Sequence, residues 1–162
     1  AYGRDDAKDY FDRLSKDLVK IVGQAIERLE PARITYSQAR CSVAINRRTP
    51  TEKGFVNHPN PNGPVDHSVP VLAAHDKAGK LKAVVFGYAC HNTIMSFFKT
   101  SGDYAGYAQK FVEQKNQGVV AMFVMGARNA PTSLQSAGAG GCASNLFGYL
   151  IRLIDSISGV CL

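Results

Sequence analysis

The stretch Leu81-Lys82-Ala83-Val84-Val85-Phe86-Gly87-Tyr88 decides the fold prediction, because apolar residues occupy both of its alternating faces. A strand that is apolar on both faces is typical of the interior of a covered sheet. Residues 68–74 form a second β-rich run just before it, and the connecting Asp76-Lys77-Ala78-Gly79-Lys80 carries a glycine near the turn. We therefore predict a β-hairpin whose second strand is central in a sheet.

The residues that follow this hairpin alternate between helix and strand signals. Asp103 can cap a helix over residues 104–114, and the apolar run 119–125 predicts a buried strand. Residues 126–141 are rich in glycine, alanine and serine, which indicates a loop. Apolar residues at helical spacing predict a last helix over residues 145–158.

The residues that precede the hairpin predict one helix, two short strands and a long loop. Residues 8–29 have apolar positions three and four apart, and Pro31 ends this amphipathic helix. Alternating patterns predict strands over residues 32–37 and 41–46. We predict an irregular loop over residues 49–67 because it is rich in residues that interrupt regular structure. These residues are Pro50, Gly54, Pro59, Pro61, Gly63 and Pro64.

The predicted element order α-β-β-β-β-α-β-α indicates the α/β class, with a layered mixed β-sheet flanked by helices. The 162 residues fit a single domain or an internal segment of one, and 45% apolar content is enough for a core. No apolar run reaches 18 residues, so no membrane-spanning segment is expected. The polar stretch 1–9 predicts no signal peptide, which leaves the location open.

Charge and cysteine content exclude some function classes. The net charge of +6 fits either a basic solvated surface or attraction to anionic lipid or nucleic acid. The basic residues are scattered and show no zinc-finger spacing, so no nucleic-acid partner is expected. The cysteines form no C-x-x-C pair, which argues against a redox motif or a structural zinc site. Three of them lie in apolar surroundings, which favours buried thiols, with disulfides left open. The four cysteines are Cys41, Cys90, Cys142 and Cys161.

Three local patterns carry candidate chemistry. His91 directly follows the end of the apolar strand, where α/β sheets present reactive groups, although a core histidine would give the same pattern. Ser101-Gly102-Asp103 begins a helix, as a plain cap or as an amino end directed at an anion. Arg47, in Asn46-Arg47-Arg48, fits either binding of a carboxylate or carbonyl oxygen or a solvated charge. The other three histidines are predicted to lie on the surface: His58, His67 and His75.

Taken together, several motifs in the same order resemble the neutral, non-lysosomal ceramidase family, over about residues 10–153. The resemblance lies in Val43-Ala44-Ile45-Asn46-Arg47-Arg48, in Phe86-Gly87-Tyr88-Ala89-Cys90-His91-Asn92-Thr93, and in Ser101-Gly102-Asp103-Tyr104-Ala105-Gly106-Tyr107. It implies an internal segment of the catalytic domain of a zinc-dependent amidohydrolase, which cleaves the N-acyl bond of ceramide or a related lipid.

The resemblance also implies roles for individual residues. His91 matches one of the family's zinc ligands. The family's other zinc ligands are a second histidine, a glutamate and a tyrosine, and these have no match in the present sequence. The zinc would acidify a bound water and polarise the amide carbonyl. Arg47 matches an arginine near the substrate and would stabilise the developing oxyanion. Asn92, Ser101 and Asp103 are the candidate substrate-binding residues.

Three functions stay open at this point. The chain belongs to a zinc amidohydrolase, to a catalytically inactive ceramidase-like domain that binds lipid or a protein partner, or to a hydrolase with another amide or ester substrate. The resemblance implies a secreted, cell-surface or periplasmic location, with possible membrane-surface association.

Overall fold

The computed structural model describes residues 4–93, 95 and 99–126, and the predicted loop 126–141 and helix 145–158 lie almost entirely outside this part. The chain divides into two compact units, Ala1–Pro31 and Ala32–Leu162, which we describe separately. Within the described residues the elements follow the predicted order, with one strand more than expected.

The first unit is a single amphipathic helix. Helix α1 covers Arg4–Glu27, so it begins four residues earlier than predicted and ends before Pro31. Its 24 residues give a length of about 36 Å. Lys8 and Asp12 form an ion pair one turn apart, with 2.7 Å between Nζ and Oδ2. Its large apolar side chains are exposed, among them Phe11, Leu18, Ile21, Val22 and Ile26.

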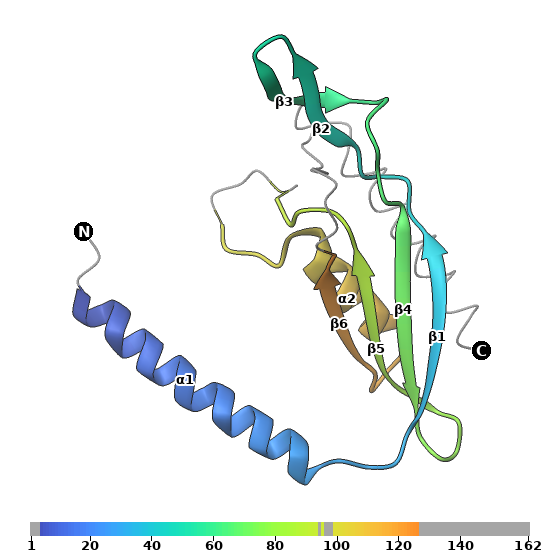
Figure 1. Ribbon diagram of the computed structural model, residues 1–162. Coiled ribbons are helices and arrows are strands. Elements are labelled where there is room, and N and C mark those ends of the chain that lie inside the picture. The colour runs from blue at the N-terminus through green and yellow to red at the C-terminus, as the bar shows by residue number, and fades with distance from the viewer. Residues whose placement is uncertain (1–3, 94, 96–98, 127–162) are drawn as a thin grey trace. The chain divides into compact units, whose positions relative to one another are not determined.

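The second unit contains a four-stranded mixed sheet in the order β1-β4-β5-β6 (Figure 1). These strands are β1 Arg33–Arg40, β4 Ser68–His75, β5 Leu81–Tyr88 and β6 Val120–Met125. β4 pairs antiparallel with both β1 and β5, and β6 pairs parallel with β5. The hairpin β4–β5 and the interior place of β5 are confirmed, and so is the mixed α/β class.

The turn of this hairpin follows from one carboxylate and one glycine. Asp76 Oδ1 accepts the backbone N–H groups of Ala78 and Lys80, each at 2.9 Å. Gly79 has a φ of 81°, a conformation that costs glycine little because it has no Cβ. An aspartate and a glycine at these positions therefore reverse the chain without a longer loop.

Helix α2, Asp103–Lys115, covers one face of the sheet (Figure 1). It connects two adjacent parallel strands, β5 and β6, which is the usual crossover in α/β folds. Its buried side chains pack with inward-facing residues of the strands to form the core. The largest members of this core include Val69, Val71, Val84, Phe86, Tyr104 and Val112.

The opposite face of the sheet is apolar and largely exposed. The strand register places Tyr36, Leu72, Val85 and Met122 in one cross-strand row. Leu72 is 45% exposed, Met122 54% and Tyr36 64%. The two faces of β5 thus differ, since only one of them is covered within the described residues.

The predicted loop over residues 49–67 is wrong, because this segment contains a β-hairpin. Strand β2, Asn46–Thr51, pairs antiparallel with β3, Gly54–Asn60. In a two-stranded ribbon each strand has a free edge, so a proline without an N–H is tolerated there. Gly54 lies at a φ of 114°, which allows the tight turn. Prolines and a glycine are therefore compatible with a ribbon that has free edges, and they did not require an irregular segment here.

The predicted strand over residues 41–46 is also wrong, because residues 41–45 form no strand. Side-chain hydrogen bonds hold this segment instead. The Tyr88 hydroxyl donates to the carbonyl of Cys41 at 2.7 Å and accepts the N–H of Ala44 at 2.9 Å. A single buried phenol thus satisfies two backbone groups of this segment, and the N–H of Cys41 donates to the His67 carbonyl at 2.9 Å.

Candidate functional site

The sheet topology brings the candidate residues to one end of the second unit. β1, β5 and β6 run in the same direction, so their carboxyl ends lie together (Figure 1). His91 follows β5, Arg47 lies in the hairpin that follows β1, and Asp103 begins the helix that returns from the β5 end. This is the end of an α/β sheet where ligands commonly bind.

His91 is exposed, and so is its neighbour Asn92. The residues before it, Ala89 and Cys90, are 6% and 2% exposed, so the chain emerges from the core directly at the histidine. The N–H of Thr93 donates to the carbonyl of His91 at 2.9 Å, which closes a tight turn. The imidazole is therefore available to a ligand, unlike a core histidine.

The Ser101-Gly102-Asp103 motif begins α2, but the cap differs from the prediction. Gly102 is the N-cap residue, and Asp103 is the first helical residue. Asp103 is 5% exposed, and its carboxylate accepts the N–H of Tyr104 at 2.7 Å and that of Met95 at 2.8 Å. Exposed Ser101 accepts the N–H of Asp103 through Oγ at 3.2 Å. The aspartate thus binds both its own helix and the segment after His91.

Arg47 is buried, with 9% of its surface exposed. The register shifts between Asn46 and Arg48, so that Arg47 of β2 lies opposite two residues of β3, His58 and Pro59. The Arg47 Nε donates to Asn57 Oδ1 at 3.1 Å, and its Nη2 donates to the Asn57 carbonyl at 3.4 Å. No carboxylate contacts Arg47 among the described residues, so its charge has only neutral partners there.

Asn46 connects the β2–β3 hairpin to the segment between β3 and β4. It is 2% exposed, and its Nδ2 donates to the Pro64 carbonyl at 2.9 Å. Its Oδ1 accepts the N–H of Arg48 at 2.8 Å. These two bonds fix the backbone on both sides of Arg47, so the asparagine of the Asn-Arg motif positions its neighbour.

Gly63 provides a test of this packing. A Cβ at Gly63 would lie 2.5 Å from Cγ and 2.7 Å from Cβ of the buried Asn46. We expect Gly63→Ala to lower the free energy of unfolding by about 1–3 kcal/mol, as overpacking of a buried site does. Gly106→Ala is the control, because a Cβ there meets nothing within 4 Å and alanine favours a helix. Urea denaturation measures both variants, and unchanged stability of Gly63→Ala would disprove the clash.

The sequence analysis missed two buried tyrosines whose hydroxyls hold backbone segments at this end of the sheet. Tyr88 holds residues 41–44, and the Tyr104 hydroxyl donates to the carbonyl of Cys90 at 2.7 Å. Burial raises the pKa of both phenols well above their ordinary value, so both remain neutral donors. The sequence did contain a signal for this role, because each tyrosine lies at the end of an apolar strand or in the first turn of a helix. A hydroxyl that is buried at such a place needs a hydrogen-bond partner.

The remaining histidines and the thiols lie as follows. His58 is exposed as predicted, but His67 is half-buried and His75 is 3% exposed, so the prediction of surface positions for these two is wrong. Every second residue of β4 faces inward, and His75 continues this alternation at the end of the strand. Cys41 and Cys90 are buried and form no disulfide within the described residues, and burial raises the pKa of the Cys41 thiol. Cys142 and Cys161 lie outside the described residues.

No group of three or more His, Cys, Asp or Glu side chains within residues 4–93, 95 and 99–126 is placed to hold a metal ion. His91 fits one position of a zinc site, because an exposed imidazole is a usual donor. A catalytic zinc site takes about three protein ligands, so the described residues do not complete one.

An apolar groove of about 390 Å³ lies on the exposed sheet face. A Cβ at Gly87 would lie 3.2 Å from the Val124 carbonyl oxygen and 3.3 Å from Pro70 Cγ, so this glycine keeps part of the groove open. Asp66 and Ser68 add polar groups to the lining. Apolar side chains dominate the lining, among them Tyr36, Leu72 and Val85. The size and the mixture are typical of small-molecule sites.

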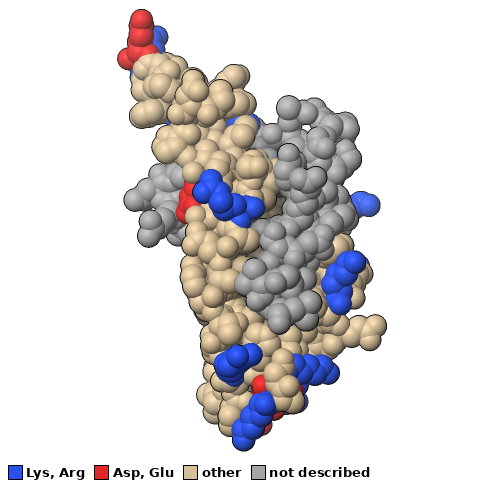
Figure 2. All heavy atoms as spheres, turned by 90° about the vertical axis from the view of Figure 1, so that its right-hand side faces the viewer, with Lys and Arg blue, Asp and Glu red and all other residues tan. Residues whose placement is uncertain are grey.

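The surface charge indicates no specific site on the one face that Figure 2 shows, among the described residues. On the face in Figure 2, basic side chains stand at several separate places and do not merge into one patch. A scattered arrangement gives a weak field compared with a concentrated patch. Neither described helix is long and apolar enough to cross a bilayer.

The arrangement of strands and loops matches solved ceramidase structures. Neutral ceramidase from Pseudomonas aeruginosa aligns with a TM-score of 0.62 and 23% identity, over 89% of this chain and 24% of that one. A ceramidase complexed with C2 aligns with a TM-score of 0.61 and 23% identity, over 82% and 22% of the two chains. The chain has the fold of a ceramidase segment. It spans about a quarter of the length of each matched ceramidase.

This likeness supports the resemblance at the level of the fold. At 23% identity, the match to ceramidase establishes the arrangement of elements and not the chemistry of single residues. No protein-family model and no curated protein sequence matches the chain.

Proposed function

We propose that the chain is part of a zinc-dependent amidohydrolase that cleaves the N-acyl bond of ceramide or a related lipid. The observation that carries this proposal is the exposed His91 at the end of the central strand, in a fold shared with neutral ceramidase. His91 would supply one zinc ligand. The other ligands would come from outside the described residues.

Arg47 is proposed as the group that stabilises the negative charge on the amide carbonyl oxygen. Asn57 occupies Nε and one N–H of Nη2, and a guanidinium has five N–H donors in all. Among the described residues the remaining donors have no partner, so they could contact an oxyanion. A buried cation that has no anionic partner in this part of the chain is costly, so binding a developing negative charge would offset part of that cost.

Asn92 and Ser101 are proposed to bind the polar part of the substrate, because both are exposed. Asn92 directly follows the proposed zinc ligand, and Ser101 lies just before the start of α2. Asp103 belongs to the same proposed substrate-binding set. Its carboxylate is already engaged by two backbone N–H groups, so its contribution would come through the position of its neighbours.

The test uses the full-length protein, purified without chelators. We expect roughly stoichiometric zinc by elemental analysis and hydrolysis of a fluorescent ceramide. Chelation should stop hydrolysis, and added zinc should restore it. Absence of both metal and turnover in the full-length protein would overturn the proposal. The proposed location is secreted, cell-surface or periplasmic, in contact with a lipid surface.

The apolar groove favours a second candidate, a ceramidase-like domain that binds the hydrocarbon part of a lipid without cleaving it. Burial of hydrocarbon contributes about 0.8 kcal/mol per methylene, so an apolar groove alone can hold a chain. Under this alternative the same experiment gives binding of the fluorescent ceramide, no turnover and no effect of chelation.

A further inference from the structure

We propose that the first turn of α2 positions His91, because the Tyr104 hydroxyl and the Asp103 carboxylate hold the chain on both sides of this histidine. Tyr104 contacts the residue before it, and Asp103 contacts Met95 after it. Both are therefore positioning residues, which act through the backbone. The part that concerns zinc rests on the proposed function.

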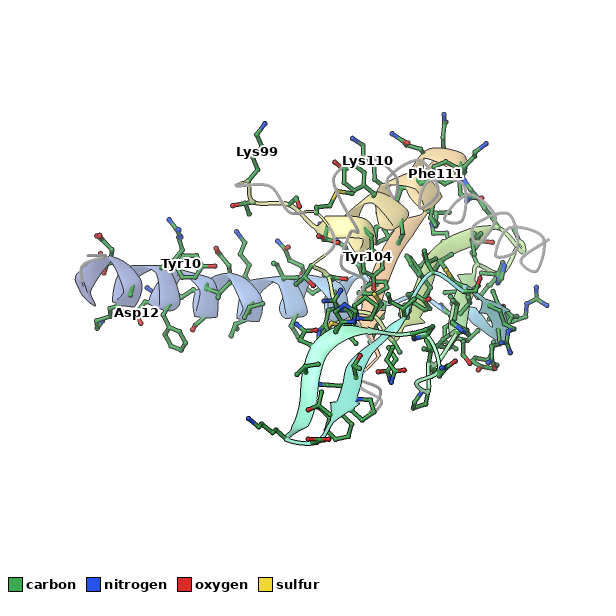
Figure 3. The ribbon with its side chains drawn as sticks, turned by 90° about the horizontal axis from the view of Figure 1, so that it is seen from above. Tyr10, Asp12, Lys99, Tyr104, Lys110 and Phe111 are labelled. Carbon is green, nitrogen blue, oxygen red and sulfur yellow. The ribbon has the colours of Figure 1, made fainter. Side chains whose placement is uncertain are left out.

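The Tyr104 contact fixes the peptide plane that leads into His91. The hydroxyl donates to the Cys90 carbonyl at 2.7 Å, and the N–H of His91 belongs to the same planar peptide group. Figure 3 shows Tyr104 on the side of α2 that faces the sheet, whereas Lys110 lies on the outer side. The ring meets Phe123 edge-on at 5.5 Å and Tyr88 at 6.5 Å between centroids. The hydroxyl is thus held at a fixed place by a packed ring.

The Asp103 contact fixes the far side of the same loop. Asp103 Oδ2 accepts the N–H of Met95 at 2.8 Å, and hydrogen bonds to a carboxylate are stronger than neutral ones. Asp103 has a φ of 50°, which is uncommon for a residue with a Cβ. Its burial at 5% exposure and its two bonds to backbone N–H groups hold it in that conformation. Such a conformation persists where surrounding contacts determine it.

The consequence is an exposed imidazole on a braced loop. His91 is open to solvent, while Cys90 before it is buried and Met95 after it is held by a carboxylate. Sites perform well when a supporting layer of contacts fixes the groups that bind or react. Neighbouring residues Asp103 and Tyr104 supply that support from one helix turn.

Tyr104→Phe tests the bracing, since it removes one oxygen and keeps the packed ring. We expect amide hydrogen exchange at Thr93 and Met95 to rise by about tenfold, as loss of a buried hydrogen bond predicts. Tyr88→Phe is the matched control. It removes the hydroxyl that holds Cys41 and Ala44, so it should destabilise the fold without changing exchange at Thr93 and Met95. Asp103→Asn should raise exchange at Met95 more than at Thr93.

A second measurement connects the bracing to the metal. In the full-length protein, Tyr104→Phe should weaken zinc binding by about tenfold, which is the lower end of the effect of losing a residue that supports a metal ligand. Tyr88→Phe should leave zinc binding unchanged. Unchanged exchange in Tyr104→Phe, or an equal rise in Tyr88→Phe, would overturn the bracing. If exchange rises as expected but the parent protein holds no zinc, the bracing stands and the proposed function fails.

Discussion

Replacing His91 with alanine in the full-length protein is expected to weaken zinc binding by more than about 100-fold, beyond the effect of losing a supporting group. Ceramide hydrolysis should fall to background. The free energy of unfolding without metal should change by less than about 0.5 kcal/mol, because the side chain is exposed and away from the core. Elemental analysis, a fluorescent ceramide assay and urea denaturation measure the three quantities.

His58→Ala is the matched control, because His58 is also an exposed histidine but lies in the β2–β3 hairpin. It should retain zinc and activity. Full zinc content and full activity in His91→Ala would remove this residue from the mechanism. A large loss of stability without metal would instead assign it a structural role.

Replacing Arg47 with alanine is expected to lower kcat by about 10²–10³, the usual effect of removing one group that stabilises an oxyanion. KM should change little, since the charge on the oxygen develops only in the transition state. Stability should fall by about 1–3 kcal/mol, because alanine removes a buried side chain together with its packing and its bonds to Asn57. Arg47→Lys should restore only part of the activity, since an ammonium lacks the planar arrangement of donors.

Arg48→Ala provides the comparison from the adjacent position. Arg48 is exposed, so its removal should leave kcat within about twofold and stability within about 0.5 kcal/mol. If Arg47→Ala unfolds the protein while Arg47→Lys is stable and fully active, the guanidinium has no catalytic role. Equal losses of activity in the two alanine variants would contradict a specific site at Arg47.

The predictions for the central part of the fold succeeded because local pattern and long-range packing agree there. Apolar residues on both faces of 81–88 indicated an interior strand, and β5 pairs with β4 and β6. The turn between β4 and β5 depends on Asp76 and Gly79, whose chemistry is local. The helix 103–115 and the strand 120–125 differ from their predicted bounds by about one residue.

The predictions failed where a distant side chain decides the local conformation. Residues 41–45 have a strand-like alternation, but a hydroxyl from β5, 44 or more positions away, satisfies their backbone groups. Residues 46–60 contain Pro50, Gly54 and Pro59, yet the ribbon forms because a two-stranded sheet leaves edges that tolerate proline. His75 was expected on the surface, and the alternation of β4 places it inside.

The sequence by itself determined the central hairpin, the helix that returns to β6, and the place of His91 just after the strand, because strand periodicity and turn chemistry act over a few neighbouring residues. The exposure of His91 came from the tertiary structure. Only the tertiary structure decided that Arg47 is held by Asn57 and that the chain around His91 is held by Tyr104 and Asp103. These contacts join residues on different elements, and their partners follow from how the elements pack, which no local pattern encodes.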